Sequence, residues 1–101
     1  MKITFNLTLI SLLIGTGIFA QTEIQTSFKS GNAKSELGDY RGAIQDYNKA
    51  IELNPKDEIA YYNRGNAKSK LGDTNGACLD YSKAGELGLE KAYEAIKRLC
   101  N

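Results

Sequence analysis

The sequence predicts an all-α protein, a short α-solenoid of two antiparallel helical hairpins followed by a C-terminal capping helix. The main observation is an internal repeat: residues 31–54 return 34 positions later as residues 65–88, with 16 of 24 aligned positions identical. A period of this length in a helix-favouring composition is typical of stacked helical hairpins, in which each unit needs a neighbour to bury its apolar face. The second observation is that both copies keep small and aromatic residues at the same positions.

Residues 1–20 have the pattern of a secretory signal peptide. Lys2 is followed by an apolar stretch that ends at Ala20, and a polar segment begins at Gln21. We expect cleavage between Ala20 and Gln21, which places the mature domain, residues 21–101, in a secreted or periplasmic location. The alternative is an uncleaved membrane anchor, because the apolar stretch approaches the shortest length that spans a bilayer.

The two repeats are expected to span residues 24–57 and 58–88, with helices over residues 24–37, 40–53, 59–71 and 75–87. Gly38 is placed to end the first helix in the left-handed conformation, and Asp39 to cap the second. Pro55 ends the second helix because it disfavours a helical residue before it. Asp57 or Glu58 then begins the third.

A capping helix is expected over residues 89–100. Its apolar residues recur at helical spacing, and charged residues cover the rest of the surface. The apolar set is Leu89, Ala92, Tyr93, Ile96, Leu99 and Cys100. A helix with one apolar and one charged face is what the open end of a helical stack requires.

The residues that the two copies share resemble the tetratricopeptide repeat family. They are Gly31, Ala43, Tyr47, Ala50 and Leu53 in the first copy, and Gly65, Ala77, Tyr81, Ala84 and Leu87 in the second. Leu-Gly-Asp lies between the helices of each copy, at residues 37–39 and 71–73. The resemblance covers about residues 24–100 and implies a protein-interaction module. A chance pair of amphipathic hairpins is the alternative.

The resemblance also assigns one face of the first helix. Ser27, Ser30 and Lys34 stand where the family usually places large apolar residues toward a preceding repeat. This face is therefore expected to meet water, with no repeat before it; local divergence of the sequence is the alternative.

Composition excludes most catalytic and metal-binding arrangements. There is no histidine, which excludes a Ser-His-Asp triad, a Cys-His pair and His-ligated zinc. We expect no enzyme activity, no metal and no cofactor; an enzyme would have to rely on carboxylates or lysines alone. Beyond residues 1–20 the chain carries 12 basic and 12 acidic side chains, so there is no electrostatic reason to expect nucleic acid. Arg64, Lys68 and Lys70 are interpreted as a solvated basic face of the third helix.

Cys78 and Cys100 are predicted to form a disulfide. They are equidistant from the turn near Gly88, so they lie at the same height in an antiparallel hairpin, and a signal peptide implies a compartment where disulfides persist. The bond would stabilise by about 3 kcal/mol in the chain-entropy model. That offsets Gly76 and Gly85, which cost about 1 kcal/mol each inside a helix. The alternatives are two buried free cysteines and a redox-active pair, for which Cys-x-x-Cys and histidine are missing.

In the tetratricopeptide repeat family, the first helix of each hairpin lines a concave groove that takes extended or helical peptides. The resemblance implies these groove residues: Phe28, Asn32, Glu36, Tyr62, Asn63, Asn66, Lys70, Lys91, Glu94 and Arg98. Phe28 and Tyr62 are expected to be apolar anchors, and the asparagines to hydrogen-bond a peptide backbone. An ordinary solvated helix face is the alternative interpretation.

One branch of the family grips a C-terminal carboxylate with asparagine and basic side chains. Asn32, Asn63 and Lys91 match that pattern, but Phe28 and Ala95 stand where basic residues belong. A working carboxylate clamp is therefore not expected.

We expect a non-catalytic adaptor that binds a peptide or helix of another protein of the cell envelope in this groove. The alternatives are a self-associating structural subunit and an assembly accessory that helps a partner to fold or move. The partner is a protein or peptide, with no nucleic acid and, after signal cleavage, no membrane; a homo-oligomer is possible.

Overall fold

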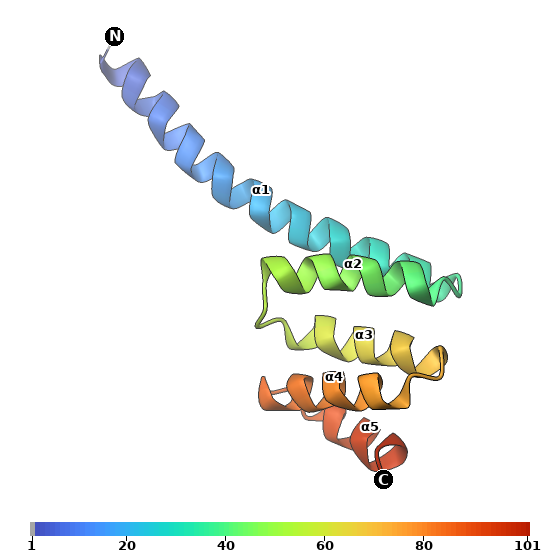
Figure 1. Cartoon of the computed structure of the whole chain (residues 1–101). Helices are drawn as coiled ribbons and strands as arrows, with labels where there is room; N and C mark the ends of the chain where they lie inside the picture. Colours follow the sequence, from blue (N-terminus) through green and yellow to red (C-terminus); the bar gives the residue numbers. More distant parts are fainter. Residues whose placement is uncertain (1) are drawn as a thin grey trace.

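The computed structural model describes the backbone of residues 2–101 and the side chains of residues 19–101. The helices of this part are α1 (Lys2–Glu36), α2 (Tyr40–Leu53), α3 (Glu58–Lys70), α4 (Thr74–Glu86) and α5 (Lys91–Leu99). The C-terminal part of α1 pairs with α2, α3 pairs with α4, and α5 closes the stack against α4 (Figure 1). This is the predicted all-α fold, a short solenoid of two hairpins and a capping helix.

Helix α1 is longer than the sequence predicts. It was expected to begin at residue 24 but begins at Lys2, and its N-terminal part extends away from the stack (Figure 1). Residues 18–30 contain no glycine or proline that would stop a helix, so the helix is not interrupted at residue 24.

The predicted signal peptide, residues 1–20, lies outside the part with described side chains except for Phe19 and Ala20, and its cleavage stays a prediction. Within the described residues, no helix has both the length and the apolar character that crossing a membrane requires.

Left-handed glycines end three of the helices, as the sequence predicts for Gly38. Gly38, Gly72 and Gly88 have φ angles of +83°, +85° and +109°, a conformation that only glycine adopts without strain. After the first two of these turns, Asp39 and Asp73 cap α2 and α4. These short turns reverse the chain direction between α1 and α2, between α3 and α4, and between α4 and α5.

The two glycines that were expected to weaken the second repeat have specific packing roles. Gly76 lies in the first turn of α4, where its N–H donates to Asp73 Oδ1 at 2.9 Å and the carboxylate fills the space of a side chain. Gly85 lies in α4 against the ring of Tyr93, and a Cβ atom there would stand 2.8 Å from Tyr93 Cζ. Each allows a close approach that alanine would block.

Small residues make up most of the core. The buried apolar side chains are Ala43, Tyr47, Ala50, Ala60, Ala67, Ala77, Tyr81, Ala84, Ala92 and Ala95. Alanines let the helices approach closely, and the two tyrosines fill the larger gaps. The shared leucines contribute less to the core. Leu53 is 38% exposed and Leu87 is half-buried, because each lies at the end of its helix.

The expected water-facing surface of the first helix is also wrong. Ser27 is 7% exposed, and Lys34 Nζ lies 3.0 Å from Asp46 Oδ2 of α2. Ser30 also hydrogen-bonds Asp46. Ser30 and Lys34 of this face thus pair with a carboxylate on the partner helix of the same hairpin.

Candidate functional site

The candidate groove lies along the first helices of the two hairpins and α5. In α1, Asn32 is oriented by the second helix of its own hairpin, because the Tyr47 hydroxyl donates to Asn32 Oδ1 at 2.6 Å. Asn63 of α3 donates to the same oxygen at 3.1 Å. The two predicted groove asparagines therefore form one hydrogen-bonded group between repeats.

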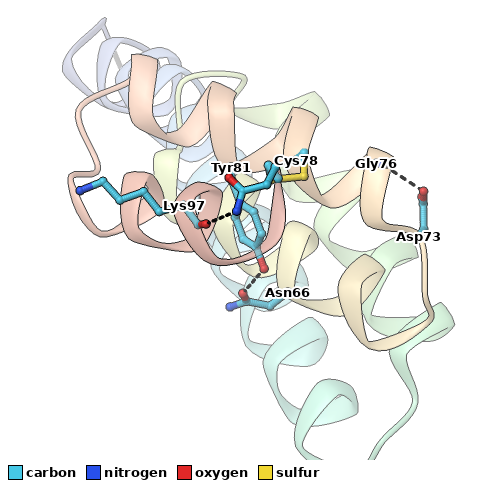
Figure 2. Close-up of a disulfide and its surroundings, with 8 residues drawn as sticks. Asn66, Asp73, Gly76, Cys78, Tyr81 and Lys97 are labelled. Atoms are coloured by element: carbon cyan, nitrogen blue, oxygen red, sulfur yellow. Dashed lines mark hydrogen bonds between the residues drawn. A yellow bond between two sulfur atoms is a disulfide. The ribbon is translucent and has the colours of Figure 1, made fainter.

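The second repeat has the same arrangement one period later. The hydroxyl of Tyr81 points at Asn66 and donates to its Oδ1 at 2.7 Å (Figure 2). Burial raises the pKa of Tyr47 to about 12 and also raises that of Tyr81, so both hydroxyls keep the proton that they donate. Each asparagine is held in one orientation by a tyrosine of its own hairpin.

An open pocket of about 230 Å³ lies between the two repeats. Its lining consists of Asn32, Ser35, Glu36, Tyr47, Asn63 and Asn66. Four of these residues, the three asparagines and Glu36, were predicted for the groove. We call this the repeat pocket.

A second pocket, of about 140 Å³, lies between the second repeat and α5. Its lining consists of Ser69, Tyr81, Ala95, Arg98 and Leu99. Arg98 is the predicted groove residue in this set. We call this the cap pocket.

Comparison with known protein families matches the chain twice. Residues 31–72 match the model described as TPR repeat, and residues 59–87 match the model described as tetratricopeptide repeat. Together the matches extend from residue 31 to residue 87, more than half of the chain. The chain belongs to the tetratricopeptide repeat family. Repeats of this family are in general modules for protein–protein interaction. A search of curated proteins finds no match.

The predicted aromatic anchors of this tetratricopeptide repeat chain are half-buried and pack on the core tyrosines. The centroids of Phe28 and Tyr47 are 6.1 Å apart, and those of Tyr62 and Tyr81 are 5.4 Å apart. Lys91 Nζ lies 4.7 Å from the centroid of Tyr62, a distance at which the cation is attracted to the ring. Tyr62 and Lys91 thus form one contact between α3 and α5.

The remaining predicted groove residues are not brought into the repeat pocket. Lys70 is exposed at the end of α3 and has no ion-pair partner among the described residues. Glu94 of α5 lies 3.5 Å from Lys97, so part of its charge is balanced within the helix.

Arg64 and Lys68 do not form the solvated basic face that the sequence suggests. Arg64 donates to both carboxylate oxygens of Asp80, from Nε at 2.9 Å and from Nη2 at 2.7 Å, and to Asn48 Oδ1 at 2.9 Å. Lys68 Nζ lies 3.0 Å from Asp80 Oδ2, and Asp80 is 4% exposed. The hydrogen bond with Asp80 raises the pKa of Arg64. These side chains connect α2, α3 and α4 beneath the groove.

The predicted disulfide between Cys78 and Cys100 is confirmed. The Cα atoms are 5.8 Å apart, and the bond connects α4 to the C-terminal end of α5 (Figure 2). The alternative of two buried free cysteines is therefore excluded. The bond fixes α5, which carries Lys91, Glu94 and Arg98, against the second repeat.

In the described part of the chain, no group of three or more His, Cys, Asp or Glu side chains is placed to hold a metal ion. The chemistry that the pockets offer is hydrogen bonding and charge pairing. That chemistry suits recognition of a polypeptide.

Proposed function

We propose that this chain is a non-catalytic adaptor that binds an extended peptide segment of another protein along its groove. The observation that carries the proposal is the matched pair Asn32 and Asn66. The amide oxygen of each accepts a tyrosine hydroxyl, while its Nδ2 group has no hydrogen-bond partner in the described part of the chain. Each asparagine thus presents a fixed, unused donor at the repeat pocket.

Fixed amide donors suit the carbonyl groups of a peptide backbone. An extended peptide exposes unpaired carbonyl oxygens along its length, and binding costs less when the side chains that receive it are already ordered. The tyrosine hydroxyls provide that order, since they hold each asparagine before a ligand arrives. Donors that meet backbone carbonyls give affinity without demanding one particular sequence.

The test begins with selection of displayed random peptides on the full chain, followed by affinity measurement for those that bind. The double variant Asn32→Ala, Asn66→Ala removes both donors and should weaken binding about tenfold or more. The matched control is Asn75→Ala, which removes an exposed asparagine from α4. Circular dichroism and thermal unfolding establish that each variant is folded.

The outcomes separate groove binding from its rivals. Loss of affinity in the double variant alone supports the groove. Equal affinity in all three proteins places the peptide elsewhere and contradicts the proposal, as does a selection that yields no binding peptide.

We also propose that the mature chain is secreted or periplasmic. The apolar stretch before Gln21 and the Cys78–Cys100 disulfide support this location, because disulfides persist in oxidising compartments. Intact mass and N-terminal sequencing of the native protein test it. A chain that starts at Gln21 supports cleavage, whereas a chain that starts at Met1 supports the retained anchor.

Self-association is the second candidate function, for a structural or assembly subunit. The observation in its favour is that Leu37 and Leu79 are 85% and 73% exposed, which leaves apolar side chains available for contact with a second copy. Sedimentation velocity over a range of protein concentrations tests it. A constant monomer would remove this candidate.

A further inference from the structure

The repeat pocket and the cap pocket occupy equivalent places, one repeat period apart. Ser69 and Tyr81 of the cap pocket correspond to Ser35 and Tyr47 of the repeat pocket, 34 residues earlier. On the other side, α5 takes the place of α3. When Ala92 is aligned with Ala60, both fully buried, Ala95 and Arg98 correspond to Asn63 and Asn66. Four of the five residues that line the cap pocket therefore correspond to residues that line the repeat pocket.

The chemistry of the two pockets differs at those equivalent positions. On the α3 side of the repeat pocket the lining consists of two amides, Asn63 and Asn66, and Glu36 of α1 adds a carboxylate. In the cap pocket an alanine and a guanidinium replace the amides, and Lys70 stands at the position equivalent to Glu36. One period along the groove, an amide and a carboxylate, Asn66 and Glu36, are thus replaced by basic residues, Arg98 and Lys70.

The basic groups near the cap pocket are not neutralised by the protein itself. Among the described residues, neither Arg98 nor Lys70 has an ion-pair partner. Lys91 lies seven residues before Arg98 on the same face of α5, and its Nζ lies over the ring of Tyr62. Glu94 lies on this face too, but its carboxylate pairs with Lys97.

The positive charge of Arg98 acts on the hydroxyl of the buried Tyr81. Burial, followed by the charge of Tyr62, raises the pKa of Tyr81, and the positive charge of Arg98 opposes this rise. Arg98 is itself an exposed residue, and it lines the cap pocket together with Ser69 and Tyr81. A carboxylate placed there would meet the fork of Arg98 and the hydroxyl of Ser69.

We propose that the cap pocket receives the carboxylate of an aspartate or glutamate side chain of the bound peptide, so that the partner is an acidic segment. The proposal rests on the proposed function, because it names the ligand class of the same groove. The size agrees, since a cavity near 150 Å³ accommodates one small planar group. A peptide that occupies both pockets would therefore bind in one direction, with its acidic residue toward α5.

The test compares three pools of random peptides of one length, blocked at both ends, with Glu, Gln or Lys at one fixed central position. The full chain should bind the Glu pool about fivefold more tightly than the Gln pool at low salt, with the Lys pool weakest. The preference should decline as salt is added. A fourth pool, with Gln at the centre and a free C-terminal carboxylate, tests whether a chain terminus is the true ligand.

Arg98→Gln should abolish the preference for Glu, and Arg98→Glu should reverse it in favour of Lys. The matched control is Lys97→Gln, which removes the same charge from the neighbouring residue of α5. Lys97 does not line the pocket, pairs with Glu94 and points away from Tyr81 (Figure 2). Its variant should keep the preference for Glu.

Each result supports or overturns the inference. Equal binding of the Glu and Gln pools overturns it and leaves groove binding standing, whereas no binding of any pool removes both. A preference for Glu that survives Arg98→Gln, or that Lys97→Gln removes equally, places the carboxylate elsewhere and overturns it. Tight binding of only the fourth pool overturns it in favour of a terminal carboxylate.

Discussion

The ring of Tyr81 lies so close to Gly65 that a Cβ atom on residue 65 would stand 2.9 Å from Tyr81 Cε1. The first repeat has the same contact, with the Cβ position of Gly31 2.7 Å from Tyr47 Cε1. In both repeats the tyrosine hydroxyl continues to the asparagine that follows the glycine. The ring reaches that asparagine because the residue beside it has no side chain, so core packing and groove geometry depend on one contact.

The first prediction concerns this glycine. Gly65→Ala should lower the free energy of unfolding by about 2 kcal/mol, because the added methyl group overpacks the Tyr81 ring. The loss occurs although alanine is favoured over glycine by about 1 kcal/mol within a helix. Urea titration followed by circular dichroism measures the difference.

Ser82→Ala is the matched control, since it changes an exposed residue of the facing helix. It should alter the free energy of unfolding by less than about 0.5 kcal/mol. A Gly65→Ala protein as stable as the wild type would show that the ring can move aside at no cost, and the link to the groove would be lost.

The features that the sequence predicts well are those that depend on local chemistry. Gly38 and Asp39 mark a helix end and start because a left-handed turn and a cap need those residue types. The disulfide follows from the equal distances of Cys78 and Cys100 from a turn, which the hairpin geometry converts into proximity. The repeat period supplies the order of the helices.

The features that the sequence misses depend on packing between helices. Arg64 belongs to a basic strip when α3 is considered alone, and only the placement of α4 brings Asp80 to it. The start of α1 was missed because residues 1–20 were interpreted as a separate signal peptide, whereas the helix continues through Gln21. The contrast between the pockets could have been found, since aligning α5 with α3 places Arg98 at the position of Asn66.

The second prediction concerns the buried carboxylate Asp80. Asp80→Asn should lower the free energy of unfolding by about 3 kcal/mol, because it leaves the half-buried Arg64 without its charged partner. Asp46→Asn changes the equivalent residue of the first repeat, where the pairing is with Lys34 and the carboxylate is more exposed, at 21%. Its effect should be clearly smaller. Equal losses in urea titrations of the two variants would contradict the role assigned to Arg64.

The third prediction is a loss of stability in alkali. Burial first, then the charges of Asp46 and Glu36, raise the pKa of Tyr47 from 10.0 to about 12. The unfolded chain therefore loses this proton at lower pH than the folded chain. The neutral hydroxyl stabilises the fold fully below about pH 10, and this contribution, at most about 3 kcal/mol, is lost between about pH 10 and pH 12.

Tyr47→Phe isolates that contribution. Over this range, the free energy of unfolding of the wild type should fall more steeply with pH than that of the variant. Tyr40→Phe is the matched control, because the Tyr40 hydroxyl makes no hydrogen bond in the described part of the chain. If the wild type and Tyr47→Phe lose stability in parallel, the hydroxyl titrates without linkage to folding.

The fourth prediction concerns the disulfide. The double variant Cys78→Ala, Cys100→Ala should lower the free energy of unfolding by about 3 kcal/mol, since the unfolded chain then loses the constraint of a closed loop. The effect should be local as well, because the buried anchors of α5 are only the two alanines Ala92 and Ala95. Hydrogen exchange should therefore quicken in α5 before it does in α2.

This variant also separates the two pockets. Arg98 lies two residues before Cys100, so release of the bond loosens the cap pocket while leaving the Tyr47–Asn32 pair of the repeat pocket in place. Backbone binding of peptides should persist, and the preference for acidic peptides should diminish. Uniform loss of both would mean that the bond supports the whole groove, whereas an undiminished acidic preference would show that α5 holds its position by packing alone.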